Sequence, residues 1–297
     1  MTASTELRRF VDVHVHHWDP ADLEMYPHLA PDFDVSGLGV PGADAMKRRY
    51  LVGDYIDDAR PWNLTAYVHV AATGRPRGYL WESDELTAAA EKGQGPAALV
   101  GTVDLELEPE EIGRDLAALS ASKLFRGIRN MHIEDPHGQG LARALGFLQD
   151  NGFVYDLVVH PETMREMTAV MSAYPDLQVV VEHVGWPTSL DGDHFRLWKE
   201  GMRRLAELRE SVTCKLSGVA MATHTFEPNV IAPWFETAVE LFGVERCMVG
   251  SNFPVDGAFG SFDTLMSSYL EVLGQFGDEA TDAMFAGNAG RVYQVDL

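Results

Sequence analysis

A succession of eight short apolar runs, separated by longer amphipathic stretches, is the feature that most constrains how this chain can fold. The runs are rich in Val, Leu and Ile and are bounded by Gly, Pro or Asp, as buried parallel strands are. Eight such runs with helical stretches between them predict an α/β protein, a single (β/α)8 TIM barrel that spans residues 1–297. The runs are Phe10–His16, Leu64–Ala71, Ala97–Leu105, Leu124–Met131, Phe153–His160, Leu177–Val184, Ser211–Ser217 and Arg246–Ser251.

The stretches between the runs have the pattern of helices, and several begin with proline and acidic residues, which suits a helix N-terminus. We expect helices over Ser83–Lys92, Pro109–Leu119, Pro161–Tyr174, Phe195–Arg209, Pro233–Phe242, Phe262–Phe276 and Glu279–Phe285. Three long segments, 20–45, 186–194 and 219–228, each follow a predicted strand. They are therefore expected to cover the C-terminal face of the barrel, where barrel active sites lie.

The charge of the chain restricts its partners. Acidic residues number 45 and basic residues 23, which gives a formal net charge of −22. Such a chain repels phosphate backbones and anionic lipid surfaces, so we expect a small-molecule substrate and neither nucleic acid nor a membrane as partner. Two cysteines that form no C-x-x-C pair, and the lack of a signal-peptide or membrane-spanning pattern, predict a cytoplasmic protein. These features leave the oligomeric state open.

The segment Val11-Asp-Val-His-Val-His16 carries the sharpest local signal for chemistry. Side chains alternate along a strand, so His14 and His16 share one face, which in a barrel strand is the interior. Two imidazoles there need hydrogen-bond partners or a metal. A chelated divalent ion and a pair of buried, hydrogen-bonded histidines are alternatives that this motif alone does not separate.

Polar side chains recur at the ends of most other runs, where a catalytic rim needs them and a packed core does not. Arg126 and Arg129 lie on opposite faces of the fourth run, so at most one enters the barrel. Lys215 is expected to be either a buried structural cation near Glu182 or a second electrophile. The remaining polar residues of this kind are His69, Asp156, His160, His183, Ser217 and Asn252.

Six motifs, taken in order, resemble those of the amidohydrolase superfamily, and more narrowly its branch of sugar-lactone hydrolases and the pyrone-dicarboxylate lactonase. They are the D-x-H-x-H start, Phe125-Arg-Gly-Ile-Arg129, Glu182-His-Val-Gly-Trp-Pro187, Cys214-Lys-Leu-Ser-Gly218, Met248-Val-Gly-Ser-Asn-Phe-Pro-Val255 and Gly287-Asn-Ala289. The resemblance implies a hydrolase that adds water to a lactone or a related activated carbonyl. It also implies that His14, His16 and His183 bind a divalent metal, with Zn²⁺ the first choice, or bind the substrate, as in metal-free members.

Two positions depart from the family pattern. Asn252 stands where the family has an aspartate that takes the proton of water, and Ala71 stands where the second run often ends in glutamate. An amide cannot accept a proton at working pH, so another group must be the base. We expect His160 in this role, oriented by Asp156 on the same face of its run. Asn252 would then orient the water or coordinate the metal through its amide oxygen, and Asp256 is expected beyond the rim.

The predicted substrate contacts come from Arg126 or Arg129, from His69 and from Lys215. A barrel-facing arginine would bind a substrate carboxylate or polarise a carbonyl group. His69 and Glu182 are weaker candidates than His160 for the base. His17, like the other histidines beside loops, is expected to be exposed to solvent.

Three functions remain open on this evidence. The first is a lactonase or a related ester hydrolase, and the second is a metal-dependent decarboxylase of the same superfamily. The third is a non-catalytic barrel that binds a ligand after losing its base. Asn252 and Ala71 favour the third function, whereas the set of histidines on the predicted rim favours an enzyme.

Overall fold

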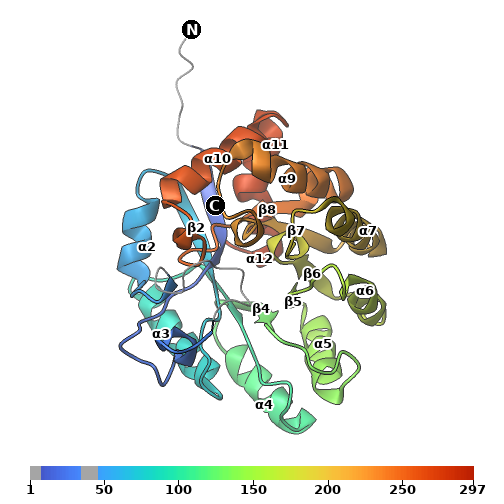
Figure 1. Cartoon of the computed structure of the whole chain (residues 1–297). Coiled ribbons are helices and arrows are strands. Elements are labelled where there is room, and N and C mark those ends of the chain that lie inside the picture. Colours follow the sequence, from blue (N-terminus) through green and yellow to red (C-terminus); the bar gives the residue numbers. More distant parts are fainter. Residues whose placement is uncertain (1–7, 35–45) are drawn as a thin grey trace.

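The computed structural model describes residues 8–34 and 46–297, and within them eight parallel strands form one sheet in chain order (Figure 1). An isolated bridge between Val15 and Phe253 brings the segment after the last strand back to the first and closes the sheet. The predicted (β/α)8 barrel is thus confirmed. The strands are β1 (Arg9–Val15), β2 (Asn63–Val70), β3 (Ala98–Gly101), β4 (Phe125–Arg129), β5 (Val154–Leu157), β6 (Gln178–Val181), β7 (Val212–Leu216) and β8 (Cys247–Val249).

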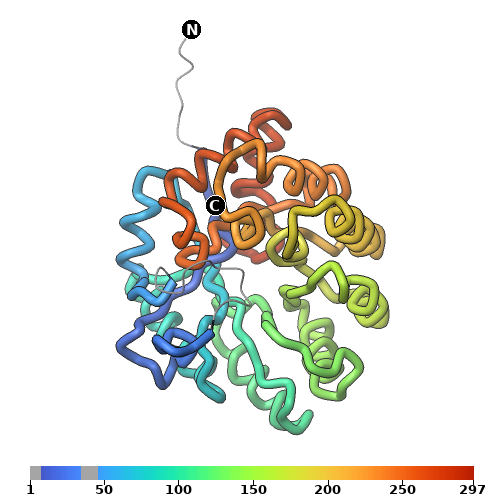
Figure 2. Tube along the Cα trace, in the orientation of Figure 1, coloured from blue at the N-terminus to red at the C-terminus, as the bar shows by residue number. Residues whose placement is uncertain are grey.

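Every predicted run overlaps one of these strands, and all eight strands end earlier than the runs do. In Figure 2 the chain passes round the barrel from blue to red, so that its first and last thirds meet at the closure. The predicted domain over residues 1–297 includes residues 1–7 and 35–45, which lie outside the described part. Residues 35–45 are also the last part of the predicted 20–45 segment. The extent of the domain therefore stays a prediction at those residues.

The helices form the outer layer of the barrel (Figure 1). The helix over Pro109–Leu119 has the predicted bounds, whereas the helices over Val52–Ala59 and Gln139–Asn151 were not predicted, the second because glycines at 140 and 146 weaken its helical pattern. The helices are α2 (Val52–Ala59), α3 (Gly78–Glu91), α4 (Pro109–Leu119), α5 (Gln139–Asn151), α6 (Met164–Ser172), α7 (Gly192–Leu208), α8 (Ala220–Thr223), α9 (Pro228–Phe242), α10 (Phe262–Gly274), α11 (Asp278–Asp282) and α12 (Asn288–Tyr293). A π-helix over Ala283–Gly287 joins α11 to α12, and short 3₁₀ helices occupy Pro27–Leu29, His183–Gly185, Val244–Arg246 and Asp256–Ala258.

The N-terminal half of the barrel interior is apolar. Its side chains pack against α12, which closes this end of the barrel, while a larger apolar cluster fills the layer between strands and helices. The interior cluster consists of Val11, Val13, Val68, Val70, Ala98, Val100, Val154, Val180 and Met248 together with Ala286, Ala289, Val292, Tyr293 and Val295. Such a packed floor restricts polar chemistry to the other end. Among the described residues, no helix combines the length and apolar character needed to cross a bilayer.

Candidate active site

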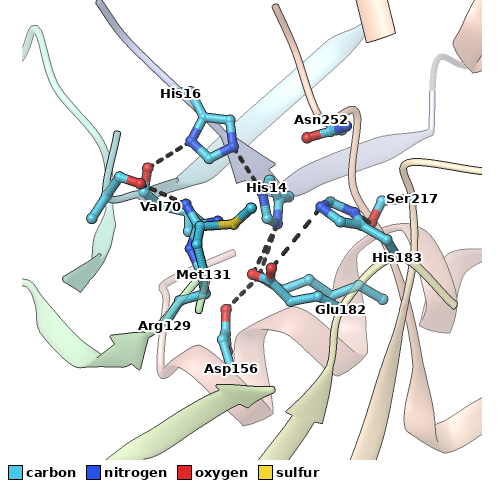
Figure 3. A network of polar contacts seen from close by, with 12 residues as sticks. His14, His16, Val70, Arg129, Met131, Asp156, Glu182, His183, Ser217 and Asn252 are labelled. Atoms are coloured by element: carbon cyan, nitrogen blue, oxygen red, sulfur yellow. Dashed lines mark hydrogen bonds and ion pairs between the residues drawn. The ribbon is translucent and has the colours of Figure 1, made fainter. Parts of the chain in front are cut away.

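Polar side chains fill the C-terminal half of the barrel interior, directly above the apolar floor (Figure 3). All of them are buried. They come from six strands or from the residues that follow them, so that residues far apart in the sequence meet at one place. The group consists of His14, His16, Arg129, Asp156, Glu182, His183, Lys215 and Asn252.

His14 and His16 face each other at the end of β1, with their Nε2 atoms 3.0 Å apart. The Nδ1 atom of His16 lies 2.8 Å from the carbonyl oxygen of Val70, so this nitrogen carries the proton and donates it. The Nε2 atom of His16 therefore presents a lone pair to His14. The Nδ1 atom of His14 lies 3.3 Å from Oε1 of Glu182 and also 3.3 Å from Nζ of Lys215.

Lys215 is the buried cation at the centre of this group. Its ammonium donates to Asp156 and lies 3.5 Å from Oε1 of Glu182, so its three hydrogens face two carboxylates and the Nδ1 atom of His14. Asp156 is held from the other side by the hydroxyl of Tyr293, which donates at 2.8 Å. The structure therefore supports the structural cation for Lys215 and contradicts its predicted role as a substrate ligand, because its donors already have partners.

His183 follows β6 in a backbone conformation that L-residues rarely adopt. His183, Val184 and Trp186 all have left-handed φ values, of 50°, 46° and 44°. Such conformations persist where surrounding contacts impose them, often at functional sites. The Nδ1 atom of His183 lies 2.9 Å from Oγ of Ser217, and a Cβ atom at Gly218 would lie 2.4 Å from the same nitrogen, so only glycine leaves room for this ring.

Three residues of the group could hold a metal ion. One ligand atom each of His14, Glu182 and His183 lies within 4.8 Å of the others. This differs from the predicted set of His14, His16 and His183, because a carboxylate takes the place of His16, which approaches His14 alone. Neutral imidazole nitrogens and a carboxylate oxygen are ligands that Zn²⁺ and similar divalent ions accept.

Two protonation states account for the 3.0 Å between the Nε2 atoms of His14 and His16. In one, Lys215 donates to Nδ1 of His14 and the Nε2 hydrogen of His14 is donated to His16. In the other, Nδ1 of His14 donates to Glu182 and two lone pairs face each other, an arrangement that a cation between them would stabilise. The Oε2 atom of Glu182 is buried without a hydrogen-bond partner among the described residues. This carboxylate oxygen and the converging lone pairs fit a divalent metal.

The electrostatics of the site keep its histidines neutral. Burial lowers the pKa values of His14, His16 and His183 well below 6.5, and the charge of Lys215 lowers those of His14 and His183 further. Burial also raises the pKa of Glu182, an effect that Lys215 opposes. Neutral imidazole is the form that binds metals.

A family model described as amidohydrolase matches residues 11–295. The chain belongs to the amidohydrolase family. This confirms the resemblance inferred from the six motifs and makes the protein a hydrolase by family.

Similar proteins cover nearly the whole of this amidohydrolase. An uncharacterised protein of Sinorhizobium fredii, y4mH, is 31% identical over 96% of this chain and 98% of its own. An L-fucono-1,5-lactonase of Burkholderia ambifaria is 27% identical, with 96% of both chains covered. The crystal structure of an amidohydrolase from Burkholderia multivorans with bound zinc has a TM-score of 0.80 and 25% identity, and the similarity covers 98% of this chain and all of that one.

Asn252 of this amidohydrolase lies beside the histidine pair, with Asp256 directly behind it. Its Nδ2 atom donates to Oδ1 of Asp256 at 2.9 Å. Asp256 is fully buried, which contradicts the expectation that it lies beyond the rim. The 3₁₀ turn at residues 256–258 directs the chain back toward the barrel, and no local sequence pattern predicts this turn.

The two arginines of β4 lie at opposite ends of the barrel. Arg129 donates to the carbonyl oxygen of Ala71 at 2.6 Å in the upper half, and its buried Nε has no partner among the described residues. Arg126 instead donates to the carbonyl oxygens of Tyr293 and Lys123 at the other end. The substrate contact predicted for Arg126 is therefore wrong, and Arg129 is the arginine that can reach a ligand.

His69 lies outside the barrel lumen. Val68 and Val70 belong to the interior cluster, so the alternation of β2 turns His69 toward the helices. There it stacks on His17 at 5.3 Å between ring centroids and lies 3.6 Å from Oε1 of Glu82 in α3. The predicted substrate contact of His69 is wrong, as is the predicted exposure of His17, which is buried.

His160 lies past the end of β5, which stops at Leu157. The predicted pairing with Asp156 is wrong, because Asp156 binds Lys215 and Tyr293, and Nδ1 of His160 has no partner within the described part of the chain. The ring of His160 packs against Trp186 at 5.5 Å, and Trp186 packs against His183 at 4.9 Å. His160 also lines a cavity of about 390 Å³, whose other walls include Met131, His132, Val158, Thr163 and Met167.

Proposed function

We propose that this amidohydrolase opens a small cyclic ester by adding water, as a lactonase does. The observation that carries the proposal is that two neutral histidines and a carboxylate converge at the C-terminal end of the barrel. Their ligand atoms lie close enough together to bind one metal ion. The similarity to L-fucono-1,5-lactonases over 96% of the chain supports the choice of a lactone among the carbonyl substrates of the family.

The proposed metal site consists of His14, Glu182 and His183, with His16 as a further nitrogen donor beside His14. We propose Zn²⁺ as the ion, supported by the donor set and by the zinc bound in the Burkholderia multivorans amidohydrolase. When bound, such an ion acts as a Lewis acid toward the carbonyl oxygen of the substrate.

In the proposed reaction, the oxygen of water forms a bond to the carbonyl carbon, and the bond from that carbon to the ring oxygen breaks. One proton of water passes to a base and then to the ring oxygen, which leaves as a hydroxyl group. Asn252 would hold the water through its amide oxygen, and Arg129 would bind the carbonyl or a substrate carboxylate through its unpartnered Nε.

The proposed base remains His160. Burial lowers its pKa below 6.5, so its ring is neutral near pH 7 and can accept a proton. Its buried Nδ1 atom has no partner among the described residues, and the ring of Trp186 contacts both its ring and that of His183. Trp186 would fix the ring in place of the predicted Asp156.

The proposed substrate is a neutral or singly charged lactone rather than a phosphorylated metabolite, because the chain has a net charge of −22. The cavity beside His160 is lined by Met131, Val158 and Met167, so it would receive the less polar part of the substrate.

A panel of sugar lactones, aromatic lactones and pyrones tests the proposal, because ring opening yields an acid that a pH indicator detects. We expect turnover of at least one class and loss of that turnover in His183→Ala. Binding of several lactones without turnover would contradict the proposal and favour the non-catalytic barrel.

A further inference from the structure

The amide of Asn252 lies between the histidine pair and a buried carboxyl group. On its far side, Nδ2 donates to Oδ1 of Asp256 at 2.9 Å and lies 3.8 Å from Sδ of Met221. Asp256 itself is fully buried, and its Oδ2 atom has no hydrogen-bond partner among the described residues. A buried polar atom without a partner costs free energy, so a contribution to stability does not explain a carboxyl group in such a place.

The residues around the side chain of Asn252 favour one of the two possible orientations of its amide group. Oδ1 of Asp256 and the thioether of Met221 both accept hydrogen bonds, so they favour the NH₂ group on their side. The amide oxygen of Asn252 is consequently turned toward His14 and His16, as Figure 3 shows. Exchange of the oxygen and the nitrogen would place an acceptor against the thioether of Met221, which has no hydrogen to donate, and a donor beside the histidines.

Hydrogen bonds fix the backbone of Asn252, so the orientation of its side-chain amide is the main conformational choice that is left. Its N–H donates to the carbonyl oxygen of His14 at 2.9 Å, and its own carbonyl oxygen accepts from the N–H of Asp256 at 3.1 Å. Its φ of 56° lies in the left-handed region that asparagine tolerates better than most residues. The main chain is therefore fixed at both ends, and the side-chain contact with Asp256 decides which atom faces the histidines.

We propose that Asp256 is a positioning residue that keeps the amide oxygen of Asn252 directed at the attacking water. This inference rests on the proposed function for the role of the water, but the orientation itself does not. The amide oxygen accepts a hydrogen bond from the water and takes no proton, so Asp256 acts by direction alone, through Asn252. The carboxyl group of Asp256 contacts the side chain of Asn252, which lies between it and the histidines.

The first experiment observes the amide directly and needs no substrate. In ¹⁵N-labelled full-length protein, the NH₂ signals of Asn252 are identified by their disappearance in Asn252→Asp. We expect them to exchange slowly with solvent in the wild type, at least about tenfold faster in Asp256→Ala, and near the wild-type rate in Asp256→Asn, which keeps a carbonyl acceptor. Unchanged exchange in Asp256→Ala would overturn the proposed orientation.

The second experiment is a double-mutant cycle on lactone turnover. Asp256→Ala should lower kcat about 10- to 100-fold with KM within about twofold, because the water is held but misdirected. In an Asn252→Ala background the same change should have no further effect, since Asp256 acts through that amide. A further drop of equal size in that background would overturn the proposal.

Asp115→Asn is the matched control, because Asp115 is a buried carboxylate that binds Arg77 and Tyr79 outside the barrel. It should change thermal stability and leave kcat unchanged. Asp256→Asn, which is isosteric, keeps the test valid if Asp256→Ala fails to fold. A protein that turns over no lactone, yet shows the predicted amide exchange, would refute the proposed function and leave the orientation standing.

Discussion

The two ends of the barrel are built from the same eight strands, but their interiors hold opposite kinds of side chains. At the N-terminal end, valines of five strands pack against α12. At the C-terminal end, β1 and the strands from β4 to β8, or the residues after them, present charged groups, imidazoles and an amide, all buried. Strand β5 illustrates the change within three residues, since Val154 belongs to the floor and Asp156 to the polar group.

Burial alone therefore does not distinguish the residues of the apolar core from those of the candidate active site. Both ends are shielded from water, but the floor is held by apolar contact, whereas the upper group is held by a chain of hydrogen bonds from Tyr293 through Asp156 to Lys215. Tyr293 belongs to α12, so one side chain of the floor reaches up to fix the cation of the site. Hydrogen bonds thus connect the two ends of the barrel.

The largest effect is expected for His160→Ala at the C-terminal end. Loss of a general base lowers kcat by about 10²–10⁴-fold. Because burial lowers the pKa of His160 below 6.5, kcat/KM of the wild type should fall as the pH drops through that lowered value and should stay constant above it. The measurement is a pH–rate profile of both proteins.

His137→Ala is the control, since His137 is exposed, lies in the loop between β4 and α5, and pairs with Glu166 of α6. Normal turnover by His160→Ala would contradict the assignment and point to Glu182, whose Oε2 atom has no partner among the described residues.

Removal of the central cation by Lys215→Met tests the connection between the two ends. It leaves Asp156 and Glu182 buried without their cation, which should cost about 3–5 kcal/mol of unfolding free energy. Lys199→Met, which removes an exposed ion pair between α7 and Glu240 of α9, should cost no more than about 1 kcal/mol. Urea unfolding measures both, and an equal, small loss in the two variants would show that the polar group does not depend on Lys215.

The two arginines of β4 offer a comparison within one strand. Arg129→Ala should lower kcat/KM by about 10²-fold, because it removes a charged donor from the upper end. Arg126→Ala should leave kcat/KM within about twofold and lower the melting temperature, because Arg126 holds the carbonyl oxygens of Tyr293 and Lys123. Steady-state kinetics and thermal unfolding would refute this division if both variants behaved alike.

A pH-dependent effect is expected for the stability of Asp256→Asn. Burial raises the pKa of Asp256 from 3.8 to about 8 in the folded protein. Between these values unfolding releases a proton from Asp256, so wild-type stability from this group is lost as the pH rises toward 8. The variant lacks this loss, and its stability relative to wild type should increase with pH up to about 8 and remain constant above. A difference that is independent of pH would contradict the raised pKa.

The sequence predicted the strands well because buried parallel strands are continuous apolar runs, and it placed His14 and His16 inside the barrel. The alternation of side chains along β2 also predicts that His69 points away from the interior, since Val68 and Val70 on either side of it face the interior. Other contacts depended on where the strands end. The predicted pair of Asp156 and His160 assumed that the strand continues to His160, whereas it ends at Leu157.

Partners brought together by turns and by distant helices had no local signal. Asp256 reaches Asn252 through a 3₁₀ turn, and Tyr293 reaches Asp156 across 137 residues of chain. The opposite orientation of Arg126 and Arg129 was predictable from their spacing, but which of the two faces the ligand depended on which end of the barrel each occupies.

We propose that His14, Glu182 and His183 form a divalent-metal site on which hydrolysis depends. The most direct test removes metal from the purified protein with a chelator, returns Zn²⁺ in steps, and follows metal content and lactone turnover together. We expect turnover to be lost with the metal, to return in proportion to Zn²⁺ up to about one ion per chain, and to remain absent in His14→Ala, which should bind less metal. Full turnover by the metal-free protein would contradict the claim and would assign these histidines to direct binding of the substrate.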